Sequence, residues 1–194
     1  MILSFTDLIA LLALILWPAI PLFWVPVHCL PKLFKRLGFF TYILPLITWL
    51  PLAFFIYHER ALLLGYQISL SLTVNVFGAV LLLLGMALQV WTLVLLTLPG
   101  IMGMPEVTST VRGRMVTRGP FSVVRHPTYL SHTMMLVGVF LFTEVVATGI
   151  AALLDFLVII SIVIPLEERE LLMRFGKEYE GYRQRVRSRF FPRP

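Results

Sequence analysis

The sequence has few of the residues that typify soluble proteins. Only 13% of its 194 residues are charged, about half the fraction usual for soluble domains. The single cysteine, Cys29, excludes an internal disulfide and every zinc motif built from several cysteines. The glycine-rich dinucleotide loop, the Walker loop, His-Glu-x-x-His and Gly-x-Ser-x-Gly are also absent. These absences argue against common soluble enzyme classes, and we expect no metal site.

Long apolar blocks dominate what is present. Hydrophobic residues make up 59% of the chain, and the mean hydropathy is +0.91. A helix crosses the hydrocarbon core with about 20 apolar residues. The pattern predicts an all-α, multi-pass membrane protein with about five transmembrane helices, and a polar pair, Thr143 and Glu144, divides the last two. The predicted spans are 6–30, 39–57, 68–98, 127–144 and 146–165.

Basic residues follow alternate spans. Under the five-span topology, 15 of the 16 Lys and Arg residues lie on one side, and only Arg60 lies opposite. The positive-inside rule makes the basic side cytoplasmic and puts the N-terminus outside. We therefore expect an integral protein of the cell membrane, or of the endoplasmic reticulum in a eukaryote. The net charge of +6 is explained by topology and by anionic lipid, so no nucleic-acid partner is expected.

Two segments on the basic side differ from membrane scaffold. The first, 99–127, ends at Pro127, a residue suited to the first position of a helix. The free amides and dipole there, beside Arg125 and His126, suit a carboxylate or phosphate. The alternative is that Arg125 and His126 only anchor the helix at the headgroup boundary.

The second segment, 165–194, predicts a cytoplasmic amphipathic helix. It is expected to pack on the protein or lie on the membrane, and Gly176 weakens it. Glu167 and Glu168 lie at its start, and neighbouring helical residues point about 100° apart. At most one of them faces a pocket, and we expect the other to be solvated. The apolar stripe comprises Leu172, Phe175, Tyr179, Tyr182 and Val186.

Within the spans, Asp155 is a costly residue at membrane depth. We expect it to face the protein interior with a partner.

In these segments the sequence resembles the isoprenylcysteine carboxyl methyltransferase family of integral membrane enzymes. The resemblance covers about residues 105–190, and the first three spans show only general hydrophobicity. Parts of the pattern are shared with phospholipid methyltransferases and some membrane sterol reductases. The matching blocks are residues 115–121, 125–129 and 167–182, with 185–186 beyond.

The resemblance implies methyl transfer from S-adenosylmethionine to the carboxylate of a C-terminal isoprenylated cysteine, with this prenylated lipid and membrane lipids as partners. One position departs from eukaryotic members, which have a substrate-binding arginine where this chain has Val163. Arg125 and Arg185 are therefore the candidate catalytic cations for the acceptor carboxylate. The implied cofactor-binding residues are Gly113, Arg114, Met115, Val116, Phe121, His126, Pro127, Thr128, Tyr129 and Glu167.

We expect the chain to comprise two parts. Residues 1–98 form three N-terminal spans, and residues 99–194 form a catalytic region of cofactor loop, helical hairpin and C-terminal helix.

A carboxylate acceptor is already ionised near neutral pH, so the reaction needs no general base. The alternatives are a phospholipid N-methyltransferase, a NADPH-dependent membrane reductase and a non-enzymatic membrane scaffold.

Overall fold

The computed structural model describes residues 3–101, 103–107 and 113–192. Over these residues the chain is helical and contains no strand, only an isolated bridge between Gln67 and Val145. The elements are α1 (Phe5–Leu16), α2 (Ala19–Cys29), α3 (Pro31–Leu37), η1 (Gly38–Tyr42), α4 (Ile43–His58), α5 (Arg60–Gly65), α6 (Leu72–Ile101), α7 (Met104–Val107), η2 (Gly119–Ser122), α8 (Pro127–Thr143), α9 (Val146–Val158), η3 (Ile159–Val163), α10 (Ile164–Phe175) and α11 (Lys177–Arg185).

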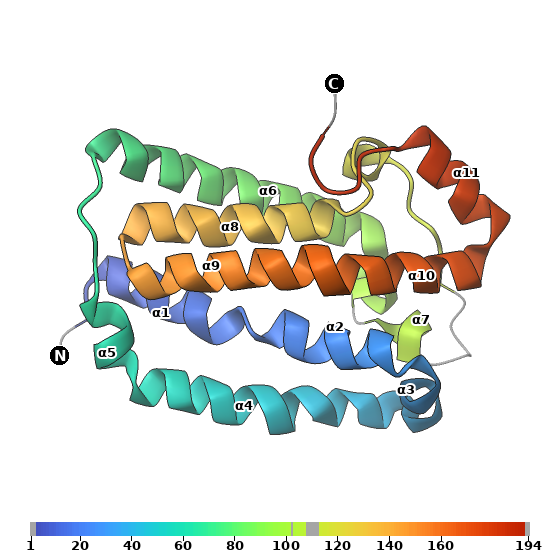
Figure 1. The fold of residues 1–194 in the computed structure, drawn as a ribbon, viewed down its shortest axis with the longest axis horizontal. Coiled ribbons are helices and arrows are strands. Elements are labelled where there is room, and N and C mark those ends of the chain that lie inside the picture. Colours follow the sequence, from blue (N-terminus) through green and yellow to red (C-terminus); the bar gives the residue numbers. More distant parts are fainter. Residues whose placement is uncertain (1–2, 102, 108–112, 193–194) are drawn as a thin grey trace.

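The long helices lie roughly side by side in one bundle (Figure 1). A continuous rod of α9, η3 and α10 runs between α8 on one side and the α1–α2 pair on the other, while α6 and α4 lie outside. All five predicted spans are helical, so the all-α prediction is confirmed. Four helical stretches are long and apolar enough to cross a membrane: Phe5–Cys29, Pro31–His58, Leu72–Thr97 and Val146–Phe175.

The fourth predicted span, α8, is shorter than these four stretches. Its 17 residues measure about 25 Å at 1.5 Å per residue, at the lower limit for a crossing helix. The predicted division after it is confirmed, because α8 ends at Thr143 and α9 begins at Val146. Glu144 makes the turn with φ 62°, a left-handed conformation that continues neither helix.

The Glu144 side chain joins the hairpin to the start of α6. One carboxylate oxygen accepts hydrogen bonds from the Leu70 backbone N–H at 2.7 Å and from Asn75 Nδ2 at 3.1 Å. These two hydrogen bonds hold the pKa of Glu144 below its usual value. These contacts hold the turn between α8 and α9 beside the start of α6, and the sequence alone does not indicate them.

Glycines set the close approach of α6 and α8. A Cβ atom added to Gly138 would lie 2.6 Å from the Leu82 backbone nitrogen and 2.8 Å from the Gly78 carbonyl oxygen. Small residues that let helix backbones approach are typical of packing in membranes. Because the clashing atoms belong to the backbone, a side chain at this position would force the two helices apart.

We expect Gly138→Ala to destabilise the protein by about 1–3 kcal/mol, the usual cost of overpacking. Thermal unfolding in detergent measures this effect. Gly65→Ala is the matched control, since nothing lies within 4 Å of a Cβ atom built there. Equal melting temperatures for the two variants would contradict the close α6–α8 contact.

Polar residues at membrane depth are paired between helices. Asp155 is fully buried, and its Oδ1 lies 3.4 Å from His132 Nε2 on α8, so the prediction that it faces the interior with a partner is confirmed. Ser131 on α8 donates a hydrogen bond to Gln89 on α6. Such pairing is expected where no water is present to satisfy polar groups.

The C-terminal amphipathic segment differs from the single helix predicted. Gly176 adopts φ 52°, and the helix breaks there into α10 and α11 rather than continuing through a weak point. Glycine reaches this conformation without the steric cost that a side chain brings. The predicted stripe survives the break: Tyr179, Tyr182 and Val186 are buried, and the partly buried Leu172 and Phe175 pack against them.

The basic segments gather at one end of the bundle. α3, residues 113–126, α10 and α11 lie at the same end in Figure 1, and α5 with Arg60 lies at the opposite end. Arg112 and Arg193 fall outside the described residues. The shared end agrees with the charge pattern, while its cytosolic orientation stays a prediction.

Candidate functional site

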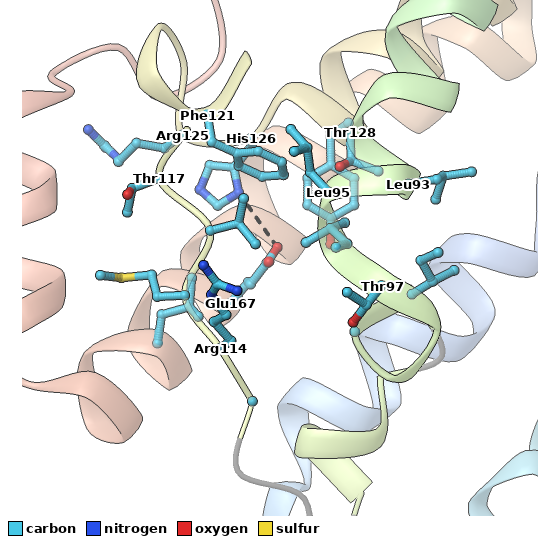
Figure 2. Close-up of a pocket in the computed structure, with 18 of the residues that line it drawn as sticks. Leu93, Leu95, Thr97, Arg114, Thr117, Phe121, Arg125, His126, Thr128 and Glu167 are labelled. Carbon is cyan, nitrogen blue, oxygen red and sulfur yellow. Dashed lines mark ion pairs between the residues drawn. The ribbon is translucent and has the colours of Figure 1, made fainter. Parts of the chain in front are cut away.

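A cavity of about 620 Å³ opens at the basic end of the bundle, within the range of about 300–1,000 Å³ typical of small-molecule sites. Its walls come from α2, the end of α6, the extended segment 113–118, η2, the start of α8, and α10–α11 (Figure 2). Segments far apart in the sequence therefore meet at one site.

Most residues predicted for the site line this cavity. Residues 113–116 run along its side, Phe121 comes from η2, and Glu167 comes from the first turn of α10. The start of α8 adds His126, Thr128 and Tyr129. The structure thus brings nine of the ten predicted cofactor residues together, while their binding role stays a prediction.

Three predicted residues lie differently. Pro127 is the first residue of α8 and is fully buried, so it shapes the helix start without lining the cavity. Arg185 ends α11, is exposed and does not line the cavity. Arg125 lines the cavity, but its guanidinium donates to Glu168 at 2.8 Å and to the carbonyl oxygens of Val186 and Arg187 at 2.8 and 3.0 Å.

The adjacent carboxylates Glu167 and Glu168 have different environments. Glu167 lines the cavity, where its buried Oε2 makes no hydrogen bond and lies 3.6 Å from His126 Nδ1. Glu168 contacts three cationic groups: Arg125 Nε at 2.8 Å, His126 Nε2 at 3.2 Å and Arg189 Nη2 at 2.7 Å.

The expectation that the second glutamate is solvated is therefore wrong. Glu168 is only 5% exposed, because the C-terminal tail folds over it and supplies Arg189. The prediction of one cavity-facing carboxylate is met by Glu167.

His126 is held between these two carboxylates and stacks on Tyr129, with ring centroids 5.9 Å apart. Burial by itself lowers the pKa of His126, but the ion pairs and charge interactions with Glu167 and Glu168 outweigh burial and raise it above its ordinary value of 6.5. The imidazole is therefore favoured in its protonated form, as a donor of hydrogen bonds and not as a base.

This raised pKa predicts a pH dependence of stability. Protonated His126 stabilises the folded state fully below about pH 6.5, and this contribution is lost as the pH rises through the folded-state pKa. We expect the melting-temperature difference between the wild type and His126→Asn to be largest near pH 6 and to shrink toward pH 9. His58→Asn is the control, because the His58 side chain is 72% exposed. A difference that grows with pH would contradict the ion pairing.

The C-terminal tail braces the loop that carries His126. The backbone N–H groups of Arg125 and His126 donate to the carbonyl oxygens of Ser188 and Arg189 at 2.9 and 3.2 Å. The Tyr182 hydroxyl donates to the Phe121 carbonyl oxygen at 2.7 Å. Burial raises the pKa of Tyr182, so this donor keeps its proton, and the loop is positioned by hydrogen bonds from both α11 and the tail.

Sequence reasoning missed the walls contributed by the first and third spans. α2 lines the cavity with Ile20, Trp24 and His28, and α6 lines it with residues that include Gln89, Leu93, Leu95 and Thr97. The spacing of four residues indicates that Ile20, Trp24 and His28 share one face of a helix. The sequence does not indicate that this face meets a cavity. Among the described residues, no group of three or more His, Cys, Asp or Glu side chains is arranged to hold a metal ion.

Comparison with known proteins agrees with this geometry. Residues 73–178 match the phospholipid methyltransferase family, so the match begins in α6 and ends in α11. No curated protein and no solved structure gives a significant match. The matched region includes the start of α8 and the first turn of α10, which meet at the cavity, and it covers more than half of the chain. The chain therefore belongs to the phospholipid methyltransferase family, among the membrane methyltransferases that its motifs indicate.

Proposed function

We propose that this membrane methyltransferase transfers a methyl group from S-adenosylmethionine to the carboxylate of an isoprenylated cysteine or a similar lipidic thioether acid. One observation supports the proposal most strongly: nine of the ten predicted donor-binding residues, all except Pro127, border the same cavity at the basic end of the bundle.

The residues around the cavity fit the methyl donor. The buried Oε2 of Glu167, which is ion-paired with His126 but makes no hydrogen bond, suits the donor's amino group or ribose hydroxyls. The first amides of α8 and protonated His126 suit its carboxylate. Val116, Phe121 and Tyr129 offer apolar and aromatic walls for adenine. When bound, S-adenosylmethionine supplies a sulfonium methyl group, whose bond to sulfur breaks as a new bond to the acceptor oxygen forms.

An acidic acceptor is favoured over an amine by the state of the protein's own groups. Methylation of an amine requires removal of a proton, whereas a carboxylate needs no base. The two neighbouring carboxylates raise the pKa of His126 and so favour its protonated form, and Glu168 is occupied by three cationic partners. Neither is suited to accept a proton. The cavity residues therefore serve to align the reactants and to exclude water.

The partner of the acceptor carboxylate stays a proposal. Position 163, an arginine in eukaryotic members, is a fully buried valine within η3, so this position offers no cation to the acceptor. Arg125 is engaged by Glu168, and Arg185 would have to turn inward from α11 to reach the cavity. Three further arginines already line it: Arg114, Arg118 and Arg174.

We further propose two entrances, a polar one from the cytosol for the donor and a lateral one from lipid for the acceptor. Both would meet near Glu167 and His126. The basic end would face the cytoplasm, as the positive-inside rule predicts.

Two measurements on the purified protein test the function. Calorimetry should show saturable binding of S-adenosylhomocysteine, and a tritiated-methyl assay should show methylation of a farnesylcysteine analogue but not of phosphatidylethanolamine. Methylation of phosphatidylethanolamine alone would replace the proposal with the amine reaction. Absence of S-adenosylhomocysteine binding would refute it, tight NADPH binding would favour a reductase, and binding of neither ligand would favour a scaffold.

A further inference from the structure

His28 is a buried polar side chain in the cavity wall that the proposed reaction does not yet use. It lies near the end of α2, is 7% exposed and lines the cavity. Its Nε2 atom is buried and has no hydrogen-bond partner. An unsatisfied buried polar atom is costly, so a ligand group in the cavity is a natural partner for it.

The face of α2 that lines the cavity changes from apolar to polar along the helix. Ile20, Trp24 and His28 recur every four residues and all line it, so they lie on one face of α2. The Trp24 indole and His28 imidazole stack with centroids 5.2 Å apart and planes inclined by 16°. The face is apolar along Ile20 and Trp24 and ends in a polar atom at the basic end. This order matches a lipid with one polar end.

The polar end of this face lies close to the reacting region. His28 interacts electrostatically with Glu167 and with Arg174, and both of these residues line the same cavity. Arg174 is ion-paired with Glu170 at 3.3 Å. His28 thus sits where a headgroup would have to lie to meet a donor held at Glu167.

The family match does not include α2, because it begins at residue 73. The predicted donor-binding residues all lie within the matched region, which runs from α6 to α11. His28 lines the cavity from outside this region and is not among the predicted donor-binding residues, so it is available to contact the acceptor.

We propose that His28 binds the methyl acceptor by donating a hydrogen bond to an anionic oxygen of the lipid headgroup, with Trp24 and Ile20 contacting the adjoining hydrocarbon. This inference rests on the proposed function and adds the acceptor subsite to it. His28 is a substrate-binding residue in this scheme and takes no proton from the acceptor.

His28→Phe tests the proposal because phenylalanine keeps an aromatic ring beside Trp24 but removes the hydrogen-bond donor. We expect the KM for the farnesylcysteine analogue to rise about tenfold or more, the effect of losing a hydrogen bond to a charged group. The affinity for S-adenosylhomocysteine should change less than twofold. His28→Gln retains a hydrogen-bond donor, so its KM should lie close to the wild-type value. This variant provides the test if His28→Phe does not fold.

His58→Phe is the matched control, since His58 is exposed at the far end of α4, and it should leave both constants unchanged. An unchanged KM in His28→Phe would overturn the proposal. Equal losses of acceptor and donor affinity would also overturn it and assign His28 to the donor site. If phosphatidylethanolamine proves to be the acceptor, the proposed function fails, and the same KM comparison with that phospholipid still decides the role of His28.

Discussion

Replacing Glu168 with glutamine is expected to lower the free energy of unfolding by about 3–5 kcal/mol, the usual cost of removing one partner from a buried ion pair. Glu168 is 5% exposed and faces Arg125, whose side chain is only 8% exposed. The substitution leaves the Arg125 guanidinium buried without its carboxylate. It also removes the charge that holds Arg189 and the C-terminal tail over the site.

Thermal unfolding in detergent measures this effect. For a chain of this size, a loss of about 3 kcal/mol lowers the melting temperature by roughly 6–12 °C. Glu180→Gln is the control, because Glu180 is exposed on α11 and a solvated carboxylate contributes little. A melting temperature within about 2 °C of the wild type would contradict the view that Glu168 joins the loop, α10 and the tail.

The neighbouring substitution, Glu167→Gln, is expected to have the opposite balance of effects. Glu167 lines the cavity, and its Oε2 makes no hydrogen bond within the protein. The protein should lose less stability than in Glu168→Gln, because the Glu167 carboxylate forms an ion pair with His126 at 3.6 Å, whereas Glu168 pairs with three cationic groups. Affinity for S-adenosylhomocysteine should fall about 10- to 100-fold, because a charge-assisted hydrogen bond to the ligand is lost.

Calorimetry on Glu167→Gln and Glu168→Gln side by side separates a binding carboxylate from a structural one. The comparison is made at a temperature where both variants are folded. If Glu167→Gln binds S-adenosylhomocysteine as tightly as the wild type, the donor does not contact this carboxylate, and the assignment of the cavity has to be revised.

Much of the fold could be predicted because apolar length and charge placement are local properties of the chain. The five predicted spans are helical over most of their length, and the turn at Thr143 and Glu144 divides α8 from α9. The break at Gly176 was underestimated. A positive φ depends on how α11 must turn to bury Tyr179 and Tyr182, and local propensity does not contain that information.

The site divides in the same way. Its polar residues lie in two short blocks, so their types and spacing were informative. The burial of Glu168 depends on Arg189, which is 21 residues away. The α2 wall depends on which face of that helix meets the cavity. The largely apolar sequence of α2 does not indicate that face.

The sequence by itself determined the membrane class, the helical spans and the two blocks that meet at the cavity. The length of the apolar runs, the placement of basic residues and the motifs are all local properties of the chain. Only the tertiary structure decided which of two adjacent glutamates faces the cavity, that the tail closes over the other, and that His28 joins the wall. These features arise from contacts between residues distant in sequence, where packing and ion pairing select one arrangement.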